Sequence, residues 1–313
     1  MEESPFISIC IPAYRRVEFL KRLLDSICAQ TYQKFEVVLT DDSPGTEVQE
    51  LVEGHPLKPK MRYFRNALSL GTPENWNESI RKASSDWIKI MHDDDWFSGP
   101  ESLKAFADVA SSGQNRFYFS GYINHYPDGM TKRLAISPGR LHAINKCPEE
   151  LMAANRIGPP SVVIFKKDPS IVFDSRMQWL VDIDFYTDFL IKHPPAVYIP
   201  KYLVCIGISD SQVTRSSFGN RGVEIRERFL LAQKLGPDGL RNLAVYDSWW
   251  RFIRNMQIRD VRDIFENGYH GEIPDSIRNM IVYQSHFSSS LLQIGILSKL
   301  LMFQHFLRNK KKF

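Results

Sequence analysis

Three consecutive carboxylates, Asp93, Asp94 and Asp95, directly follow an apolar segment of the chain. Carboxylates this close repel one another, and burying unpaired charge is unfavourable. A divalent cation removes this conflict, and oxygen ligands suit Mg²⁺ or Mn²⁺, whose coordination shell is usually completed by substrate phosphates. The alternative is a solvated turn that caps the next helix. The position after an apolar strand favours the cation site.

A second acidic pair, Asp41 and Asp42, precedes the turn-forming residues 43–45 (SPG). An aspartate here could form only an Asx-turn. It could also accept hydrogen bonds from a nucleoside, as an acid near the second strand does in dinucleotide-binding folds. A further cluster follows the first apolar segment, namely Pro12, Ala13 and Tyr14. Because Tyr14 offers an aromatic ring for a base, the combination favours a nucleotide site.

Strands must position these three clusters. Apolar and β-branched runs predict strands at 6–11, 35–39, 61–65 and 87–91, and helical spacing predicts helices at 17–29, 46–53 and 74–83. Alternating strands and helices indicate a mainly parallel α/β sheet, in which ligands bind beyond the carboxyl ends of the strands. All three clusters fall at such ends, and we therefore expect one site there.

The pattern is looser after residue 99. We expect a helix at 101–110, strands at 116–120 and 161–165, a helix at 180–191 and one or two strands in 196–208. Residues 121–147 suggest a hairpin or a long irregular excursion, with a turn at 127–129. From about 222 the sequence is helical in character. Ser and Gly cluster at 215–222, so we predict a domain of residues 1–218 and a helical extension of residues 219–313.

Composition and motifs exclude several classes of protein. The chain has 313 residues, 43% of them hydrophobic, which excludes disorder, and its formal charge of +4 gives no sign of a nucleic-acid partner. Motifs of Rossmann dehydrogenases, P-loop NTPases, zincins and α/β-hydrolases are absent from the sequence. With neither a basic leader nor an apolar run of about 18 residues, we expect a cytoplasmic protein. Cys10 and Cys28 are expected to be core residues in a reducing compartment.

Six segments, in order, resemble glycosyltransferase family 2. They are SICIPAY (8–14), LLDSICAQTY (23–32), FEVVLTDDS (35–43), NWNESIRKA (75–83), WIKIMHDDDW (87–96) and LVDIDF (180–185). The resemblance covers about residues 6–215. It implies an inverting enzyme that uses a nucleotide-diphosphate sugar. The implied fold is α/β of the GT-A type, with a mainly parallel mixed sheet flanked by helices and a Rossmann-like nucleotide-binding half.

The resemblance also implies roles for single residues. Those expected to contact the donor are Pro12, Ala13, Tyr14, Asp41, Asp42, Asn77, Asp93 and Asp94. Within this set Asp42 matches the residue that reads the base, often uracil. Asp94 and Asp95 match the end of the D-x-D element that holds Mn²⁺ or Mg²⁺. Asp182 matches the catalytic base.

Three positions depart from the family pattern. His92 stands where the first Asp of D-x-D is usual, Val181 replaces the Glu before the base, and Arg15 replaces an Asn. Asp184 competes with Asp182 as the base, but two residues further along a helix it points elsewhere. Thr214 and Arg215 are candidates for a phosphate contact.

We therefore expect a metal-dependent enzyme that transfers a sugar, most simply from a UDP-sugar, to a glycan or lipid-linked glycan in surface polysaccharide assembly. One alternative is a non-catalytic sugar-nucleotide-binding protein on the same fold. Another is a sugar-1-phosphate nucleotidyltransferase, which the lack of a glycine-rich loop after the first strand disfavours.

Residues 291–307 are strongly apolar, and four of the next six residues, RNKKKF, are basic. This pattern is typical of an interfacial anchor drawn to anionic lipid. It also suits a core helix with a solvated basic tail. A lipid-linked acceptor would favour the first alternative, a peripheral contact of residues 291–313 with a membrane surface.

Overall fold

The computed structural model describes residues 6–208, 219–236 and 238–309. The chain divides into two compact units. The first comprises Met1–Asn145, Arg156–Ser175 and Asp188–Gln212, and the second comprises Lys146–Asn155, Arg176–Thr187 and Val213–Phe313. The second unit thus includes two segments that precede the helical extension. The predicted boundary between residues 218 and 219 adjoins residues outside the described part and stays a prediction, and the candidates Thr214 and Arg215 also lie outside it.

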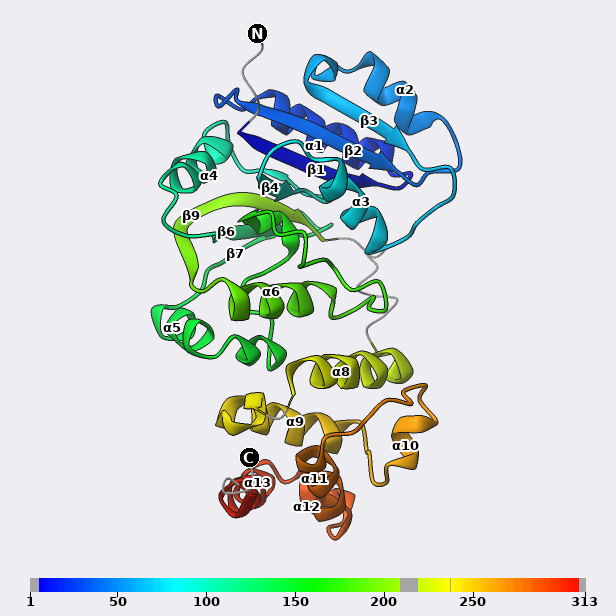
Figure 1. The fold of residues 1–313 in the computed structure, drawn as a ribbon, viewed down its shortest axis with the longest axis vertical. Helices are drawn as coiled ribbons and strands as arrows, with labels where there is room; N and C mark the ends of the chain where they lie inside the picture. The colour runs from blue at the N-terminus through cyan, green and yellow to red at the C-terminus, as the bar shows by residue number, and fades with distance from the viewer. Residues whose placement is uncertain (1–5, 209–218, 237, 310–313) are drawn as a thin grey trace. The chain divides into compact units, whose positions relative to one another are not determined.

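The first unit is built on one nine-stranded sheet in the order β3-β2-β1-β4-β8-β6-β9-β5, with β7 paired to β6 (Figure 1). The strands are β1 (Ile7–Ala13), β2 (Phe35–Asp41), β3 (Met61–Arg65), β4 (Trp87–Ile90), β5 (Trp96–Phe97), β6 (Phe117–His125), β7 (Thr131–Leu134), β8 (Val163–Lys166) and β9 (Ala196–Gly207). Strands β3, β2, β1 and β4 run parallel, as do β6 and β9. The pairings of β8 with β4 and β6, of β7 with β6, and of β5 with β9 are antiparallel. The sheet is therefore mixed, and its N-terminal half is the predicted parallel part.

Burial on both faces explains why β1 and β2 are continuous apolar runs. Every residue of β2 and six of the seven in β1 are buried. Helix α1 (Val17–Cys28) buries a stripe of apolar residues at helical spacing, Leu20, Leu23, Leu24 and Ile27. The other helices that lie wholly in this unit are α2 (Glu47–Gly54), α3 (Glu74–Lys82) and α4 (Ser102–Ser111), with the 3₁₀ turns η1 (Lys58–Lys60) and η3 (Pro160–Val162).

Several local predictions need correction. Cys10 is buried as expected, but Cys28 is exposed, because the buried stripe of α1 ends at Ile27 and the helix itself ends one residue later. Residues 121–147 do form the predicted hairpin, with Gly129 at a positive φ of 83° in its turn. They also form a helix, α5 (Pro138–Lys146), which the weak apolar periodicity did not reveal. Residues 196–207 form one long strand.

The second unit is helical, as predicted from about residue 222. Its elements are η2 (Pro148–Met152), α8 (Arg221–Leu235), η4 (Asp238–Arg241), α9 (Leu243–Asn255), α10 (Arg262–Phe265), α11 (Asp275–Ser285), α12 (Ser289–Gln293) and α13 (Gly295–Asn309). Aromatic packing forms much of its core: Phe229 of α8 meets buried Trp249 of α9 edge-on, with ring centroids 5.2 Å apart. Helix α6 (Val181–Lys192) contributes its residues up to Thr187 to this unit. Among the described residues we find no helix with the length and apolar character needed to cross a membrane.

Candidate active site

Strand register brings the three predicted clusters to one edge of the sheet. Strand β1 lies between β2 and β4, so Ala13 pairs with Asp41 and Cys10 pairs with Ile90. The segments that follow these strands therefore start side by side. The acids Asp41, Asp42, Asp93, Asp94 and Asp95 are all buried, at most 7% exposed. A simple solvated turn does not account for this burial.

Arg16 compensates the charge of the triple acid. Its guanidinium donates one hydrogen bond to Asp93 Oδ1 at 2.6 Å and one to Asp94 Oδ2 at 3.0 Å. Arg16 precedes α1, and both it and Arg15 have positive φ angles, 26° and 61°. Non-glycine residues with positive φ are uncommon and strained. This strained turn carries the Arg16 guanidinium, and the two buried carboxylates need its positive charge.

The acids remain only partly compensated. Burial raises the pKa of Asp93 to about 7, against the opposing effect of Arg16. Burial, followed by the neighbouring charge of Asp94, raises the pKa of Asp95 well above its ordinary value. Asp95 accepts hydrogen bonds from the Ser161 hydroxyl and from the backbone N–H of Gly207. The cluster would therefore be stabilised by further positive charge.

The carboxylate oxygens of this cluster suit a small divalent cation. The protein would supply only one or two of its ligands, and substrate phosphates or water would supply the others. In the described ranges no group of three or more His, Cys, Asp or Glu side chains is placed to hold a metal ion. Mg²⁺ and Mn²⁺ sites commonly use one or two carboxylates plus substrate phosphates. Asp94 and Asp95 are the candidate pair. His92, which replaces the first Asp of the family pattern, packs against the Trp76 ring with centroids 4.5 Å apart, and the desolvation of its imidazole lowers its pKa to about 4.

Asp41 and Asp42 shape the neighbouring loops. Asp41 accepts from the Tyr63 hydroxyl at 2.7 Å and from the Ser43 N–H at 2.8 Å, which is the Asx-turn considered from the sequence. Asp42 accepts from the Asn66 side chain at 2.6 Å and from two backbone N–H groups, Leu70 at 3.1 Å and Gly71 at 2.8 Å. Asp42 thus holds the loop of residues 66–71 beside the end of β2.

The remaining candidate donor contacts differ in how accessible they are. The Tyr14 side chain is 47% exposed, and the Arg15 guanidinium lies 5.0 Å from its ring centroid. Ala13 is buried, and its carbonyl accepts from the Asp42 N–H at 3.0 Å. Pro12 precedes it at the end of β1. The Asn77 amide exchanges two hydrogen bonds with the backbone of Phe173, so its contact with a donor stays a prediction.

The candidate base belongs to the second unit. Asp182 lies in the first turn of α6, where it accepts from the Asn155 side chain at 2.6 Å and from the Ile183 N–H at 2.8 Å. Burial raises its pKa to about 6, against the lowering effect of these hydrogen bonds. An aspartate with this pKa is ionised at neutral pH and still basic enough to take a proton.

Asp184, the other candidate for the base, forms an ion pair. Asp184 is fully buried, and both of its carboxylate oxygens accept from the Lys234 ammonium of α8, at 2.6 and 2.7 Å. Such a pair anchors α6 to α8. Since its carboxylate is bound to a cation, Asp184 is the poorer proton acceptor of the two.

Sequence reasoning did not find Glu227. This fully buried residue of α8 accepts from three consecutive backbone N–H groups that precede α6, those of Gln178, Trp179 and Leu180, at 2.7 to 2.9 Å. It gives partners to the amides of the segment that leads into the helix and places a negative charge near the positive end of the helix dipole. The sequence contains no signal that links Glu227 to these amides, which lie 47 to 49 positions before it.

Comparison with known proteins places this geometry in a family. Residues 8–181 match the model of glycosyl transferase family 2, which is more than half of the chain. The chain belongs to glycosyltransferase family 2. The match starts in β1 and ends at the start of α6, and thus contains every acid of the sheet edge.

Two solved structures and one relative illustrate the similarity of this family 2 member. The putative colanic acid biosynthesis glycosyl transferase WcaA of Escherichia coli is 28% identical over 69% of this chain and 78% of its own. TarS of S. aureus superposes with a TM-score of 0.60 and 15% identity, over 98% of this chain and 55% of TarS, and its fragment 1–349 has been solved with UDP-GlcNAc. The mannosyltransferase PcManGT of Pyrobaculum calidifontis, solved with GDP-Man and Mn²⁺, gives a TM-score of 0.58 at 14% identity, over 99% of this chain and 87% of its own. These likenesses confirm the predicted GT-A fold.

Replacing Glu227 with Gln should destabilise the second unit. The variant loses the negative charge that faces three backbone N–H groups, and Gln retains only one acceptor atom. Hydrogen bonds to a charged group contribute about 1.5–3 kcal/mol, so we expect a loss of about 2 kcal/mol in the free energy of unfolding. Chemical denaturation followed by tryptophan fluorescence would measure it.

Glu266→Gln is the matched control, because Glu266 lies on the exposed side of the same unit. We expect it to change stability by less than about 0.5 kcal/mol. Equal denaturation midpoints for the two variants would show that Glu227 does not hold the start of α6.

Proposed function

We propose that this protein is an inverting glycosyltransferase that moves a sugar from a nucleotide-diphosphate sugar to a hydroxyl group of a glycan or lipid-linked glycan. The observation that carries the proposal is Asp182, a carboxylate of raised pKa that lies on a separate element from the acids of the sheet edge. In such a transferase one set of acids binds the donor and its metal ion, and another acid takes the proton from the acceptor hydroxyl. WcaA, named as a putative colanic acid biosynthesis enzyme, supports a role in surface polysaccharide assembly.

For the donor we propose a UDP-sugar at the carboxyl ends of β1, β2 and β4. Tyr14 presents an exposed ring on which a base can stack. Asp42, whose N–H donates to the Ala13 carbonyl, would read the base in addition to holding the loop of residues 66–71. The complex of TarS with UDP-GlcNAc and that of PcManGT with GDP-Man support a nucleotide sugar as the donor class. Arg16, which is partly exposed, lies where a diphosphate would approach the acids.

For the metal we propose Mn²⁺ or Mg²⁺ held by Asp94 and Asp95, and the Mn²⁺ of the PcManGT complex supports this choice. When bound, the ion would supply positive charge against the charge that develops on the departing diphosphate. Asp93 would contact the donor from the same cluster and remain paired to Arg16. The hydrogen bonds of Asp95 to Ser161 and Gly207 would fix the orientation of its carboxylate.

For the chemistry, inversion requires attack on the anomeric carbon from the side opposite the leaving nucleotide diphosphate. The acceptor oxygen forms the new bond to this carbon while its proton passes to Asp182, and the bond to the diphosphate breaks. Asn155 holds the Asp182 carboxylate in place for this transfer. We place the reaction in the cytoplasm, with acceptors reached at the membrane surface.

Asp182→Asn should lower transfer by about 10²–10⁴-fold, the usual effect of losing a general base. Asparagine keeps the size and most hydrogen bonds of the side chain but cannot take the proton. Binding of UDP, measured by calorimetry, should remain unchanged, because a base acts in the transition state. Transfer assays with the candidate donors provide the measurement. A non-catalytic sugar-nucleotide-binding protein would show no transfer in either form.

Asp184→Asn is the contrasting variant. It removes the charge that binds the partly exposed Lys234 ammonium, so it should destabilise the fold by about 1.5–3 kcal/mol. The transfer rate per folded molecule should stay within a few-fold of the original. If Asp184→Asn abolished transfer and Asp182→Asn did not, the base would be Asp184.

The rate should depend on pH through Asp182. Because its pKa is raised to about 6, the carboxylate is the active form above this pH and is lost as pH falls through it. At pH 5 we expect kcat/KM about tenfold below its plateau, and the inflection should be absent in Asp182→Asn. An inflection near pH 6 that persists in this variant would assign the titration to another group.

Metal dependence can be tested at the triple acid. Asp95→Ala should abolish the enhancement of UDP binding by Mn²⁺, and Asp94→Ala should weaken it. Asp86→Ala, which removes a carboxylate with a 78% exposed side chain just before β4, is the control and should leave it unchanged. An unchanged enhancement in the two cluster variants, checked for folding by circular dichroism, would contradict a metal at these acids.

A further inference from the structure

Helix α13 presents an apolar stripe to solvent. The exposed side chains are Ile296 (80%), Leu300 (62%), Phe303 (45%) and Leu307 (54%), spaced four, three and four residues apart. This spacing places them on one side of the helix. Other α13 residues, Met302, His305 and Phe306 among them, are buried in the second unit. The helix therefore has a buried face and an apolar face that stays exposed among the residues that the structure describes.

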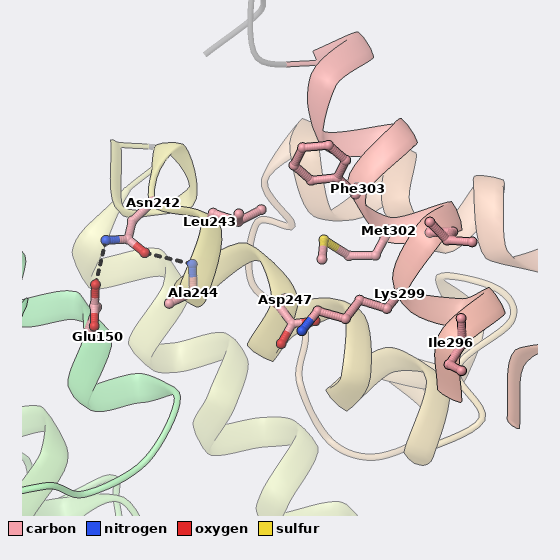
Figure 2. A pocket seen from close by; sticks show the side chains of 10 residues that line it. Glu150, Asn242, Leu243, Ala244, Asp247, Ile296, Lys299, Met302 and Phe303 are labelled. Carbon is pink, nitrogen blue, oxygen red and sulfur yellow. Dashed lines mark hydrogen bonds between the residues drawn. The ribbon is translucent and has the colours of Figure 1, made fainter. Parts of the chain in front are cut away.

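The stripe continues into a cavity of about 830 Å³ between α13 and the start of α9 (Figure 2). Six of its lining residues are apolar, namely Leu243, Ala244, Ile296, Leu300, Met302 and Phe303, and four are polar, namely Glu150, Asn242, Asp247 and Lys299. Among these, Asn242 is engaged, since it donates to Glu150 and caps the first amides of α9. An apolar occupant suits the lining better than a polar one.

The C-terminal segment of the sequence is basic, although Glu150 and Asp247 also line the cavity. After Asp275 the sequence has no further Asp or Glu, whereas it has six Lys or Arg, at positions 278, 299, 308, 310, 311 and 312. Lys299, which precedes Leu300, lines the cavity, and Arg308 lies in the last turn of the helix. The last three lysines lie outside the described residues, so only their presence in the sequence is used. An anionic surface would complement this excess of six positive charges.

We propose that the stripe of α13 docks on the surface of an anionic phospholipid bilayer, with the cavity receiving an acyl chain. An exposed apolar face next to the basic residues Lys299 and Arg308 is typical of a helix that lies in the plane of the interface. A second copy of the chain is the poorer occupant, because it would bring Lys299 and Arg308 of one copy towards those of the other. Binding depends neither on the donor nor on Asp182, so the docking surface goes beyond the proposed reaction.

Flotation of the full chain with vesicles tests the proposal. We expect binding to vesicles of phosphatidylcholine with phosphatidylglycerol, weaker binding to phosphatidylcholine alone, and a loss of binding as salt rises. The double variant Ile296→Ser/Leu300→Ser should reduce the partition by at least tenfold, because two apolar side chains no longer enter the lipid. Val172→Ser, which changes a 53% exposed apolar residue of the first unit, is the matched control and should bind as the original does.

Both changed side chains of α13 are exposed, so the melting temperature and UDP binding should stay as in the original chain. Equal binding to neutral and anionic vesicles, or equal binding by the double variant and the original, would overturn the proposal. A dimer that light scattering detects for the original chain but not for the double variant would also overturn the proposal. The stripe would then be an interface between two copies of the chain. If the original chain binds these vesicles but shows no transfer with the candidate donors, the proposed reaction is wrong and the docking surface still stands.

Discussion

The burial of three adjacent carboxylates at the end of β4 is the constraint on which the donor half of the fold depends. Three like charges can be buried there only if cations and N–H groups compensate them. Arg16 does so from the turn between β1 and α1, at the expense of a strained backbone. On the other side Gly207 approaches so closely that an added Cβ would lie 2.5 Å from the Asp94 carbonyl oxygen. The acids therefore determine the conformation of segments from β1 and β9 as well as their own.

The alternation of elements and the acids at strand ends could be predicted from the sequence because both are local signals. The runs that form β1 and β2 are buried on both faces, so they are apolar throughout, and α1 has a clear stripe ending at Ile27. The position of Asp182 in the first turn of a helix was predicted for the same reason. The register of β1 with β2 and β4 then explains why separate clusters form one site.

What the sequence did not reveal depends on distant partners. Arg16 is separated from the acids it compensates by 77 and 78 positions, and an isolated Arg after a strand has no distinctive pattern. Glu227 sits within an ordinary helical segment, and only the fold shows that three amides converge on it. Helix α5 was missed because only one of its residues, Ile144, is buried, which leaves little periodicity to detect.

The segment that carries Asp182 has consequences for where this enzyme can be divided. By covalent order it lies between β8 and β9, yet its contacts with Glu227 and Lys234 assign it to the helical unit. The region that matches the family model ends at residue 181, one position before Asp182 and well before Glu227 and Lys234, which hold helix α6. A shortened chain that kept the whole family region and β9 but ended before α8 would retain the donor edge while losing the support of its base. The end of the family match is therefore not the end of the structural unit. In a chimaera that exchanges the donor half, α8 would have to stay together with α6.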